Sequence, residues 1–185
     1  MRGFFGRLSR LVLVPLFRAH LGWLAANPIS GYLMVVETRG RESGRTRRAS
    51  VMYAIDDGSV YAMAGWGATT GWYRNSLARP EVTALLPARK VEGTAEEVID
   101  PAGRARALRL ILRASGLSAF SEGVSPWIDC DEKLLASAET KPVVRIRPSS
   151  GPVRPGSFDP GGRGWLLTPG LLAALVVGWL AFRGL

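Results

Sequence analysis

Cysteine and histidine are almost absent from this sequence: its 185 residues include one of each, Cys130 and His20. A single cysteine excludes an intrachain disulfide and makes a reducing compartment the simpler assumption. With one cysteine and one histidine, the usual Cys/His zinc sites are also excluded, and we expect no bound metal. A serine hydrolase would have to use His20, which lies in an N-terminal segment whose pattern points to a membrane surface. We therefore set both chemistries aside.

Negative charge is also scarce. The chain has 24 Lys and Arg against 15 Asp and Glu, a net charge of +9, and a pI near 10.7. This excess favours an anionic partner, which leaves nucleic acid, anionic lipid and a phosphorylated cofactor as candidates. The length is sufficient for one domain with its own core and additional terminal segments.

The C-terminal segment lacks charge altogether over a long run. Residues 164–185 read GWLLTPGLLAALVVGWLAFRGL, with no charged residue between Trp165 and Phe182. That length reaches the lower limit for a membrane-spanning helix, and its tryptophans are typical of interface anchors. We expect a transmembrane helix at 164–185; the alternative is a buried C-terminal helix. Arginines that precede it favour a cell-membrane protein with its main domain on the cytoplasmic side: Arg145, Arg147, Arg154 and Arg163.

Residues 1–27 alternate apolar and basic residues with a helical period. This pattern predicts an N-terminal amphipathic helix lying on an anionic membrane. A signal peptide is the rival interpretation, but its apolar core would be short and would contain Pro15. Membrane lipid is therefore an expected partner.

Residues 28–148 have the pattern of a β-rich domain, followed by a Pro/Gly-rich linker at 149–163. Apolar runs predict strands at 32–36, 51–55, 59–64, 82–86, 89–98 and 143–146. Asp56-Asp57-Gly58 predicts a tight hairpin turn. Helices are expected at 70–78, with Thr70 as the cap, and at 101–116, after the capping residue Asp100.

The stretch from Thr38 to Ser50, TRGRESGRTRRAS, places five arginines and two glycines between two strands. A glycine-containing loop with guanidinium groups suits a phosphate or a carboxylate. It is not a P-loop, because no Gly-Lys-Ser/Thr opens a helix. A solvated hairpin turn is the alternative, and we do not expect nucleic acid, since no aromatics alternate with the basic residues.

Two motifs together resemble a known family. The stretch 38–47, TRGRESGRTR, and the stretch 64–75, AGWGATTGWYRN, are similar to the deazaflavin-dependent nitroreductase and quinone reductase family. The likeness extends over about residues 31–120. It implies a mainly β (α+β), FMN-binding-like split β-barrel with flanking helices. It also implies an oxidoreductase that transfers a hydride from reduced coenzyme F-420 to a quinone, a nitro compound or a similar electron-poor acceptor, and suggests a homodimer.

The resemblance also implies residue roles. Arg41, Ser43, Gly44 and Arg47 would hold the anionic tail of the coenzyme. The deazaflavin ring and the phosphate would lie against a second group: Gly65, Trp66, Gly67, Trp72, Tyr73 and Asn75. Trp72 and Tyr73 could equally belong to the core.

No side-chain acid stands out, because in such enzymes the coenzyme supplies the hydride. Tyr73 and Tyr53 are the candidate proton donors, with water as the alternative, and Tyr53 and Trp127 are further candidates on the acceptor side. Glu42 departs from the basic residue of many relatives and would repel a phosphate unless it pairs with Arg41 or Arg45. FMN is the second choice of cofactor, and a non-catalytic membrane-associated barrel that binds lipid or haem is the rival function.

Overall fold

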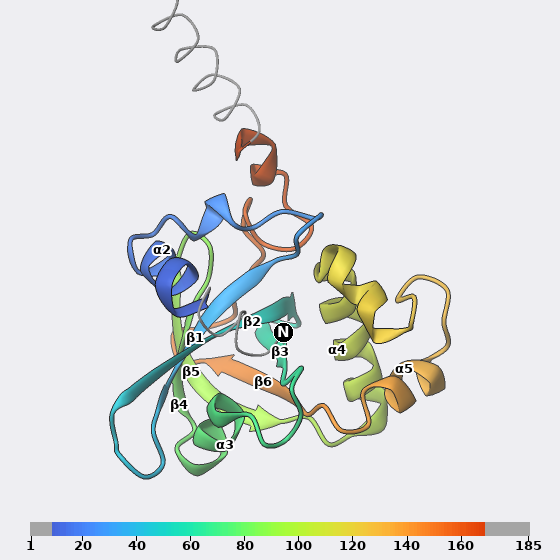
Figure 1. The fold of residues 1–185 in the computed structure, drawn as a ribbon, viewed down its shortest axis with the longest axis horizontal. Coiled ribbons are helices and arrows are strands. Elements are labelled where there is room, and N and C mark those ends of the chain that lie inside the picture. The colour runs from blue at the N-terminus through green and yellow to red at the C-terminus, as the bar shows by residue number, and fades with distance from the viewer. Residues whose placement is uncertain (1–8, 169–185) are drawn as a thin grey trace, which may run out of the picture.

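The computed structural model of this chain describes residues 9–168. Six antiparallel strands form one closed barrel in the order β1-β2-β3-β6-β5-β4 (Figure 1). Their bounds are β1 Leu33–Arg39, β2 Thr46–Asp56, β3 Ser59–Met63, β4 Glu81–Leu85, β5 Lys90–Glu97 and β6 Val143–Pro148. The expected mainly β barrel with flanking helices is therefore confirmed.

The hairpin between β2 and β3 forms where the sequence predicts it. Asp56 pairs with Ser59, and the two residues between them, Asp57 and Gly58, have φ values of 46° and 69°. Two consecutive positive φ values are those of a type I′ turn, which matches the right-handed twist of paired strands.

The hairpin between β1 and β2 is longer than the apolar runs predict. Strand pairing continues through Thr38 with Arg47 and Arg39 with Thr46, so only residues 40–45 form the turn. Most of the arginine stretch is thus strand rather than loop. The predicted strands were too short because they ended where the apolar residues end. In the structure, hydrogen bonds between β1 and β2 keep the polar residues beyond that point in strand conformation.

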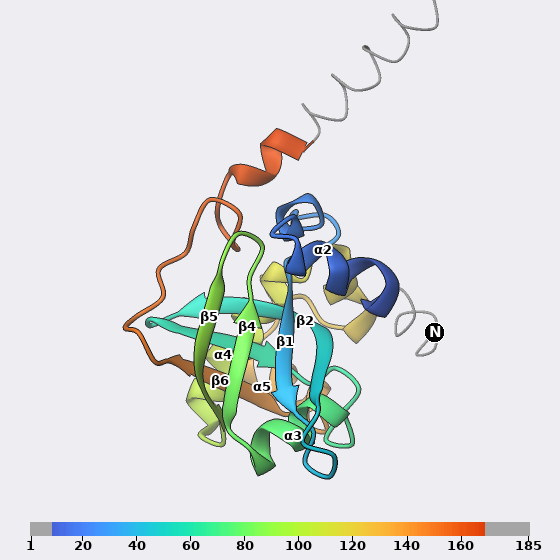
Figure 2. The same ribbon diagram turned by 90° about the vertical axis from the view of Figure 1, so that its left-hand side faces the viewer.

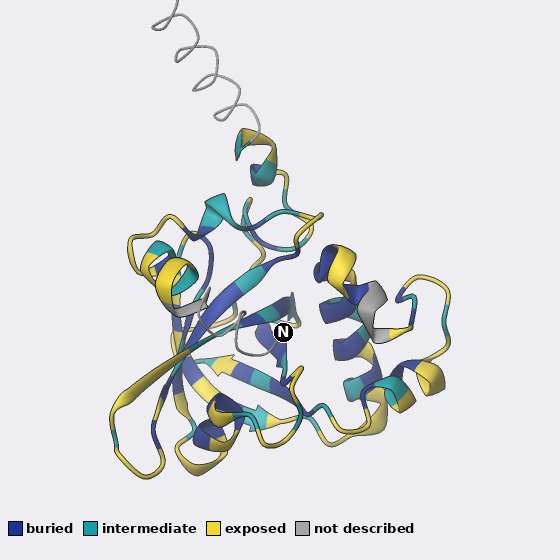
Figure 3. Cartoon of the chain, in the orientation of Figure 1, coloured by how far each residue is buried: buried dark blue, intermediate teal, exposed yellow. Residues whose placement is uncertain are grey.

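Two helices flank the barrel close to the predicted positions. Helix α4, Pro101–Ala114, begins after Asp100, whose carboxylate accepts a 2.7 Å hydrogen bond from the Gly103 amide. Its buried face, dark blue in Figure 3, packs Leu108 and Ile111 against the barrel. Helix α3, Gly71–Ala78, also begins as expected, but Thr70 does not cap it with its side chain; that hydroxyl donates to the Gly67 carbonyl instead.

Shorter elements complete the described chain. The N-terminal part has a π-helical turn at Ser9–Leu13, α2 at Val14–Arg18 and a 3₁₀ turn, η2, at Gly22–Leu24. After α4 come η3 at Gly116–Glu122 and α5 at Asp131–Ser137, and η4 follows at Gly164–Leu166. Residues 1–8 of the predicted amphipathic helix lie outside the described residues.

No helix within residues 9–168 is long and apolar enough to cross a membrane. The predicted transmembrane helix at 164–185 lies, from residue 169 onward, outside the described residues. The transmembrane assignment therefore stays a prediction.

The segment expected as a linker, 149–163, packs against the barrel. Asp159 within it is only 3% exposed and accepts hydrogen bonds from the Tyr53 hydroxyl at 2.6 Å, Arg89 at 2.5 Å and the Gly156 amide at 2.7 Å. Val153 also donates its amide to the Gly58 carbonyl. Proline and glycine content indicates irregular backbone correctly, but one buried aspartate with three donors is enough to fix such a segment.

Candidate functional site

A pocket of about 530 Å³ lies beside the β1–β2 turn. Three parts of the chain contribute to its wall: the hairpin, the start of α3 and Val14 of the N-terminal helix. The hairpin supplies a charged wall, comprising Arg41, Glu42, Ser43, Arg47 and Arg48. Helix α3 supplies Trp72 and Asn75. Cationic, hydroxyl and aromatic groups are therefore gathered in one concave site.

The turn itself is closed by its backbone. The Gly44 amide donates to the Gly40 carbonyl at 2.8 Å, and the Gly40 amide donates to the Arg45 carbonyl at 2.9 Å. Gly44 has φ of 65°, a left-handed conformation that costs little without a β-carbon. Ser43 accepts a weak hydrogen bond, 3.4 Å, from the Arg45 amide. The arginine side chains are thus displayed from an ordered turn.

Asn75 connects α3 to this turn. Its side-chain oxygen accepts from the Arg41 amide at 3.2 Å and from Arg41 Nη1 at 3.4 Å, and its amide nitrogen donates to Thr38 Oγ1 at 3.4 Å. The asparagine is 5% exposed. Asn75 lines the pocket, and its contacts indicate that it positions the turn.

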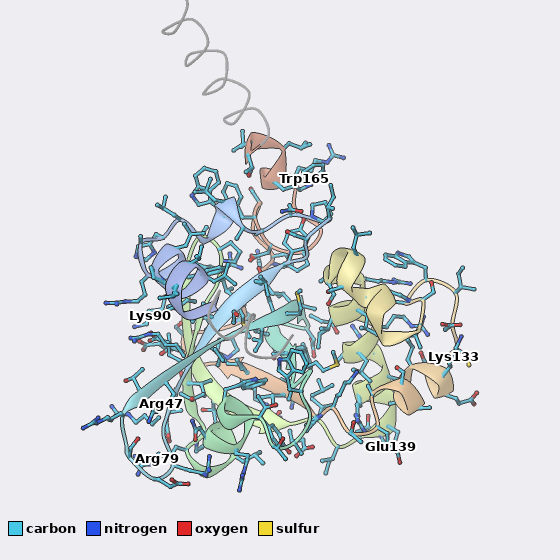
Figure 4. All side chains as sticks on the ribbon, viewed as in Figure 1. Arg47, Arg79, Lys90, Lys133, Glu139 and Trp165 are labelled. Atoms are coloured by element: carbon cyan, nitrogen blue, oxygen red, sulfur yellow. The ribbon has the colours of Figure 1, made fainter. Side chains whose placement is uncertain are left out.

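The positive charges of the pocket are not equivalent. Arg41 forms an ion pair with Glu42 at 2.9 Å, and Arg48 forms one with Glu37 at 2.5 Å. Glu42 is therefore paired with Arg41, one of the two partners expected for it from the sequence. Among residues 9–168, no ion pair involves Arg47, which extends from the hairpin in Figure 4. Arg47 is thus the pocket cation that remains available to an anionic ligand.

Trp72 and Tyr73 are both buried, 6% exposed, with their rings edge to face at 6.5 Å. Trp72 lines the pocket, whereas Tyr73 donates its hydroxyl to Glu97 of β5 at 2.6 Å. Burial and this hydrogen bond raise the pKa of Tyr73 to about 12. Of the two, only Trp72 is placed to touch a ligand in the pocket.

Tyr53 is a core residue rather than part of the pocket. It is fully buried in the barrel, and its hydroxyl is engaged by Asp159. Burial, with a further contribution from Asp159, raises its pKa well above 10. Both properties oppose the predicted role of proton donor, because the proton is held inside the barrel.

Several other predicted residues lie apart from this pocket. Gly65, Trp66 and Gly67 form the loop before α3 and do not line it, and Gly44 belongs to the turn without lining it. Trp66 is 52% exposed, so it does not fill the pocket that a planar ligand would need. Trp127 is on the loop before α5, where Arg109 and Arg113 donate to the neighbouring Pro126 carbonyl.

Sequence reasoning missed part of the wall. Thr46 and Arg48 are in the same arginine stretch as Arg47, and the pocket follows consecutive residues of that stretch, so closeness in sequence was the available signal. Val14 carried no such signal, because its contribution depends on how the N-terminal helix packs against β2.

Fold and site together define a class: a split barrel with an arginine-lined pocket next to an aromatic side chain. The chain matches the family described as F420H(2)-dependent quinone reductase over residues 17–119, more than half of its length, and it belongs to that family. The predicted family is therefore confirmed. The deazaflavin coenzyme F-420 is the cofactor of this family, and the chain is a deazaflavin-dependent oxidoreductase.

Solved structures with a similar fold include a conserved hypothetical protein from Mycobacterium tuberculosis. It is 20% identical, with 65% of this chain and 74% of that chain covered and a TM-score of 0.50. An F-420 reductase is 22% identical, covering 69% of this chain and 94% of that one, with a TM-score of 0.43. These likenesses concern the fold, and membership rests on the family match. No curated protein sequence matches the chain.

Proposed function

We propose that this protein transfers a hydride from reduced coenzyme F-420 to a quinone, with the anionic tail of the coenzyme bound at Arg47. The observation that carries the proposal is this arginine, which has no ion pair among the described residues and lines the pocket beside Trp72. The donor set suits the coenzyme, since guanidinium and hydroxyl groups bind phosphate and carboxylate.

The residues of the pocket have distinct tasks in this proposal. Arg47 and Ser43 bind the anionic tail, while Asn75 holds Arg41 and the turn in place. Trp72 and Val14 supply apolar wall. The bound coenzyme supplies the hydride, so the protein's contribution is orientation and electrostatics.

The proton that completes reduction of the acceptor comes from solvent. Tyr73 and Tyr53 both donate their hydroxyl protons to carboxylates, Glu97 and Asp159. Among residues 9–168, the only carboxylate that lines the pocket is that of Glu42, which is paired with Arg41 and strongly exposed. The proton therefore passes from solvent to the acceptor without a side chain that relays it.

We place the protein at the cell membrane, with the barrel on the cytoplasmic side. The support is the uncharged sequence between Trp165 and Phe182 and the exposure of Leu11 and Val12 in the π-helical turn before α2. A homodimer stays a prediction.

The test is fluorescence titration of the purified full chain with oxidised coenzyme F-420 at low and high salt. Arg47→Ala should weaken binding by about tenfold, the loss typical of one charge-assisted hydrogen bond, and should reduce the salt dependence. Arg74→Ala is the matched control, because Arg74 is exposed on α3 but does not line the pocket. Equal effects of the two substitutions would show that only net charge matters and would refute the site.

Hydride transfer needs its own measurement. Oxidation of the reduced coenzyme should be followed with menaquinone and ubiquinone analogues and with a nitroaromatic compound. Faster oxidation with quinones supports the proposed acceptor class. Turnover of the nitro compound alone would leave the coenzyme site intact and overturn the quinone assignment.

A further inference from the structure

The two ends of the barrel differ in character. Figures 1 and 2 show the β1–β2 turn and α3 at one end, and η2, the turn at 25–31 and η4 at the other. The first end carries the arginines of the pocket. Trp165, labelled in Figure 4, marks the opposite end.

Apolar side chains are exposed at this opposite end. The exposed fractions are 42% for Leu21, 65% for Ile29, 67% for Leu117, 53% for Leu166 and 63% for Leu167. Single exposed leucines are ordinary, but a group of them at one end marks an interaction surface. We call these five residues the apolar end.

The segments that carry the apolar end are fixed to one another. The Leu117 amide donates to the Ile29 carbonyl at 2.9 Å, joining η3 to the turn at 25–31. The rings of Trp23 and Phe158 lie 5.5 Å apart, and η2 contacts η4. Asp159 anchors the segment before η4 to Tyr53 and Arg89. The exposed side chains are therefore presented by a connected framework rather than by separate loops.

Two observations indicate a lipid bilayer as the occupant. The chain leaves the apolar end at Leu167 and continues through a sequence without charge as far as Phe182. Arg18 and Arg163 are exposed near η2 and η4, where cations suit anionic headgroups. We propose that the apolar end rests on the bilayer and that the arginine turn faces the aqueous phase.

This orientation deepens the membrane association of the proposed function and is independent of which coenzyme binds. It has a chemical consequence. The polyanionic coenzyme would approach the pocket from water, away from the negative surface potential of the membrane. Arg47 would bind the coenzyme without competition from anionic lipid.

The orientation can be tested with single-cysteine variants of the full chain in a Cys130→Ser background. Ile29→Cys and Leu117→Cys report on the apolar end, and Ala78→Cys, exposed at the end of α3, is the matched control. Each variant carries an environment-sensitive fluorophore and is reconstituted into vesicles of phosphatidylcholine and phosphatidylglycerol. Circular dichroism of each variant verifies that it is folded.

On addition of vesicles, we expect the emission maximum of the labels at positions 29 and 117 to shift to the blue, and their emission to be quenched by brominated lipid. The emission of the label at position 78 should be unchanged. Co-flotation with vesicles but no lipid quenching at 29 and 117 would overturn the orientation and leave membrane association standing. Failure to co-float would instead overturn membrane association. A blue shift of the labels at 29 and 117 in the absence of vesicles would also refute the proposal, because the apolar end would then be covered by protein. Size-exclusion chromatography would show whether that protein is a second copy, in a dimer, or residues 169–185 of the same chain, in a monomer.

Discussion

At the residue scale, charge in the pocket is organised by pairing rather than by number. The arginine stretch contains five cations, but Arg41 and Arg48 are each bound to a glutamate. An anionic ligand therefore meets a smaller effective charge than the sequence suggests. Glu42 is the residue that most directly sets this effective charge, since it lines the pocket itself.

Glu42→Gln should tighten binding of coenzyme F-420 by a few-fold. The substitution removes a negative charge from the pocket and frees Arg41 from its 2.9 Å ion pair. The gain is limited to about 1 kcal/mol or less, because the glutamate is 82% exposed and solvent screens it. Fluorescence titration at low salt measures the change.

Glu92→Gln is the control, since it alters net charge equally but breaks an exposed pair with Lys90 on β5. The same few-fold gain in both variants would mean that Glu42 acts only through net charge. Weaker binding by Glu42→Gln would mean that the glutamate itself contacts the coenzyme.

Tyr73→Phe should lower the free energy of unfolding by about 1 kcal/mol at neutral pH, the usual value of one hydrogen bond. Because the folded-state pKa of Tyr73, about 12, lies above the ordinary value, its stabilisation is complete below about pH 10. It is then lost as the pH rises towards about 12. The difference in urea midpoint between parent and variant should shrink over this interval.

Glu97→Gln should narrow that interval, because it removes the charge that helps to raise the Tyr73 pKa.

Quinone reduction at neutral pH should be unchanged by Tyr73→Phe. A large loss of turnover with unchanged coenzyme binding would restore Tyr73 as a proton donor.

At the scale of elements, local signals located the turns and helix starts, and long-range contacts decided the rest. Asp57-Gly58 and Asp100-Pro101 act through backbone conformation within a few residues, so the sequence is sufficient to place them. The ends of β1 and β2 depend on the partner strand. The fixed course of 149–163 depends on Asp159 meeting Tyr53 and Arg89, which are far away in the chain.

The candidate site divides in the same way. Ser43 and Arg47 were found from composition and from resemblance, because they share one short stretch with the turn. Tyr53 was misplaced because an apolar strand sequence does not tell which face points into a closed barrel. Val14 was missed because helix packing brings it to the pocket from a distant part of the chain.

Asp159→Ala should destabilise the barrel by about 2 kcal/mol, because it removes a buried carboxylate that accepts hydrogen bonds from Tyr53, Arg89 and Gly156. The substitution leaves Arg89 without its carboxylate and Tyr53 without its acceptor. Urea unfolding measures the loss. Asp56→Asn is the control: its pair with Arg106 is more exposed, so we expect a smaller loss of stability. Similar losses would indicate that 149–163 contributes no more than a surface contact.

At the scale of the whole molecule, the chain combines a folded barrel with two terminal segments that we propose lie at the membrane. The pocket and the apolar end both involve the N-terminal region, through Val14 and Leu21. The uncharged C-terminal sequence is the strongest argument for the proposed membrane association.

Ending the chain after residue 168 should leave the barrel folded and move much of the protein from the membrane fraction to the supernatant. All six strands and Asp159 remain in this shortened chain. Circular dichroism and coenzyme titration verify folding, and flotation measures membrane binding. If the shortened chain unfolds, residues 169–185 belong to the core; if it floats like the full chain, the N-terminal helix is sufficient.

The position of β6 has a consequence for how the protein is made. Of the six described strands it is the last in sequence, yet it lies between β3 and β5 in the barrel. While the chain is being synthesised, both neighbours present unpaired edges until residues 143–148 have emerged. Strand edges of this kind pair readily with other chains. The nascent protein is thus most prone to aggregation just before residues 143–148 emerge, and this is when a chaperone would protect it most.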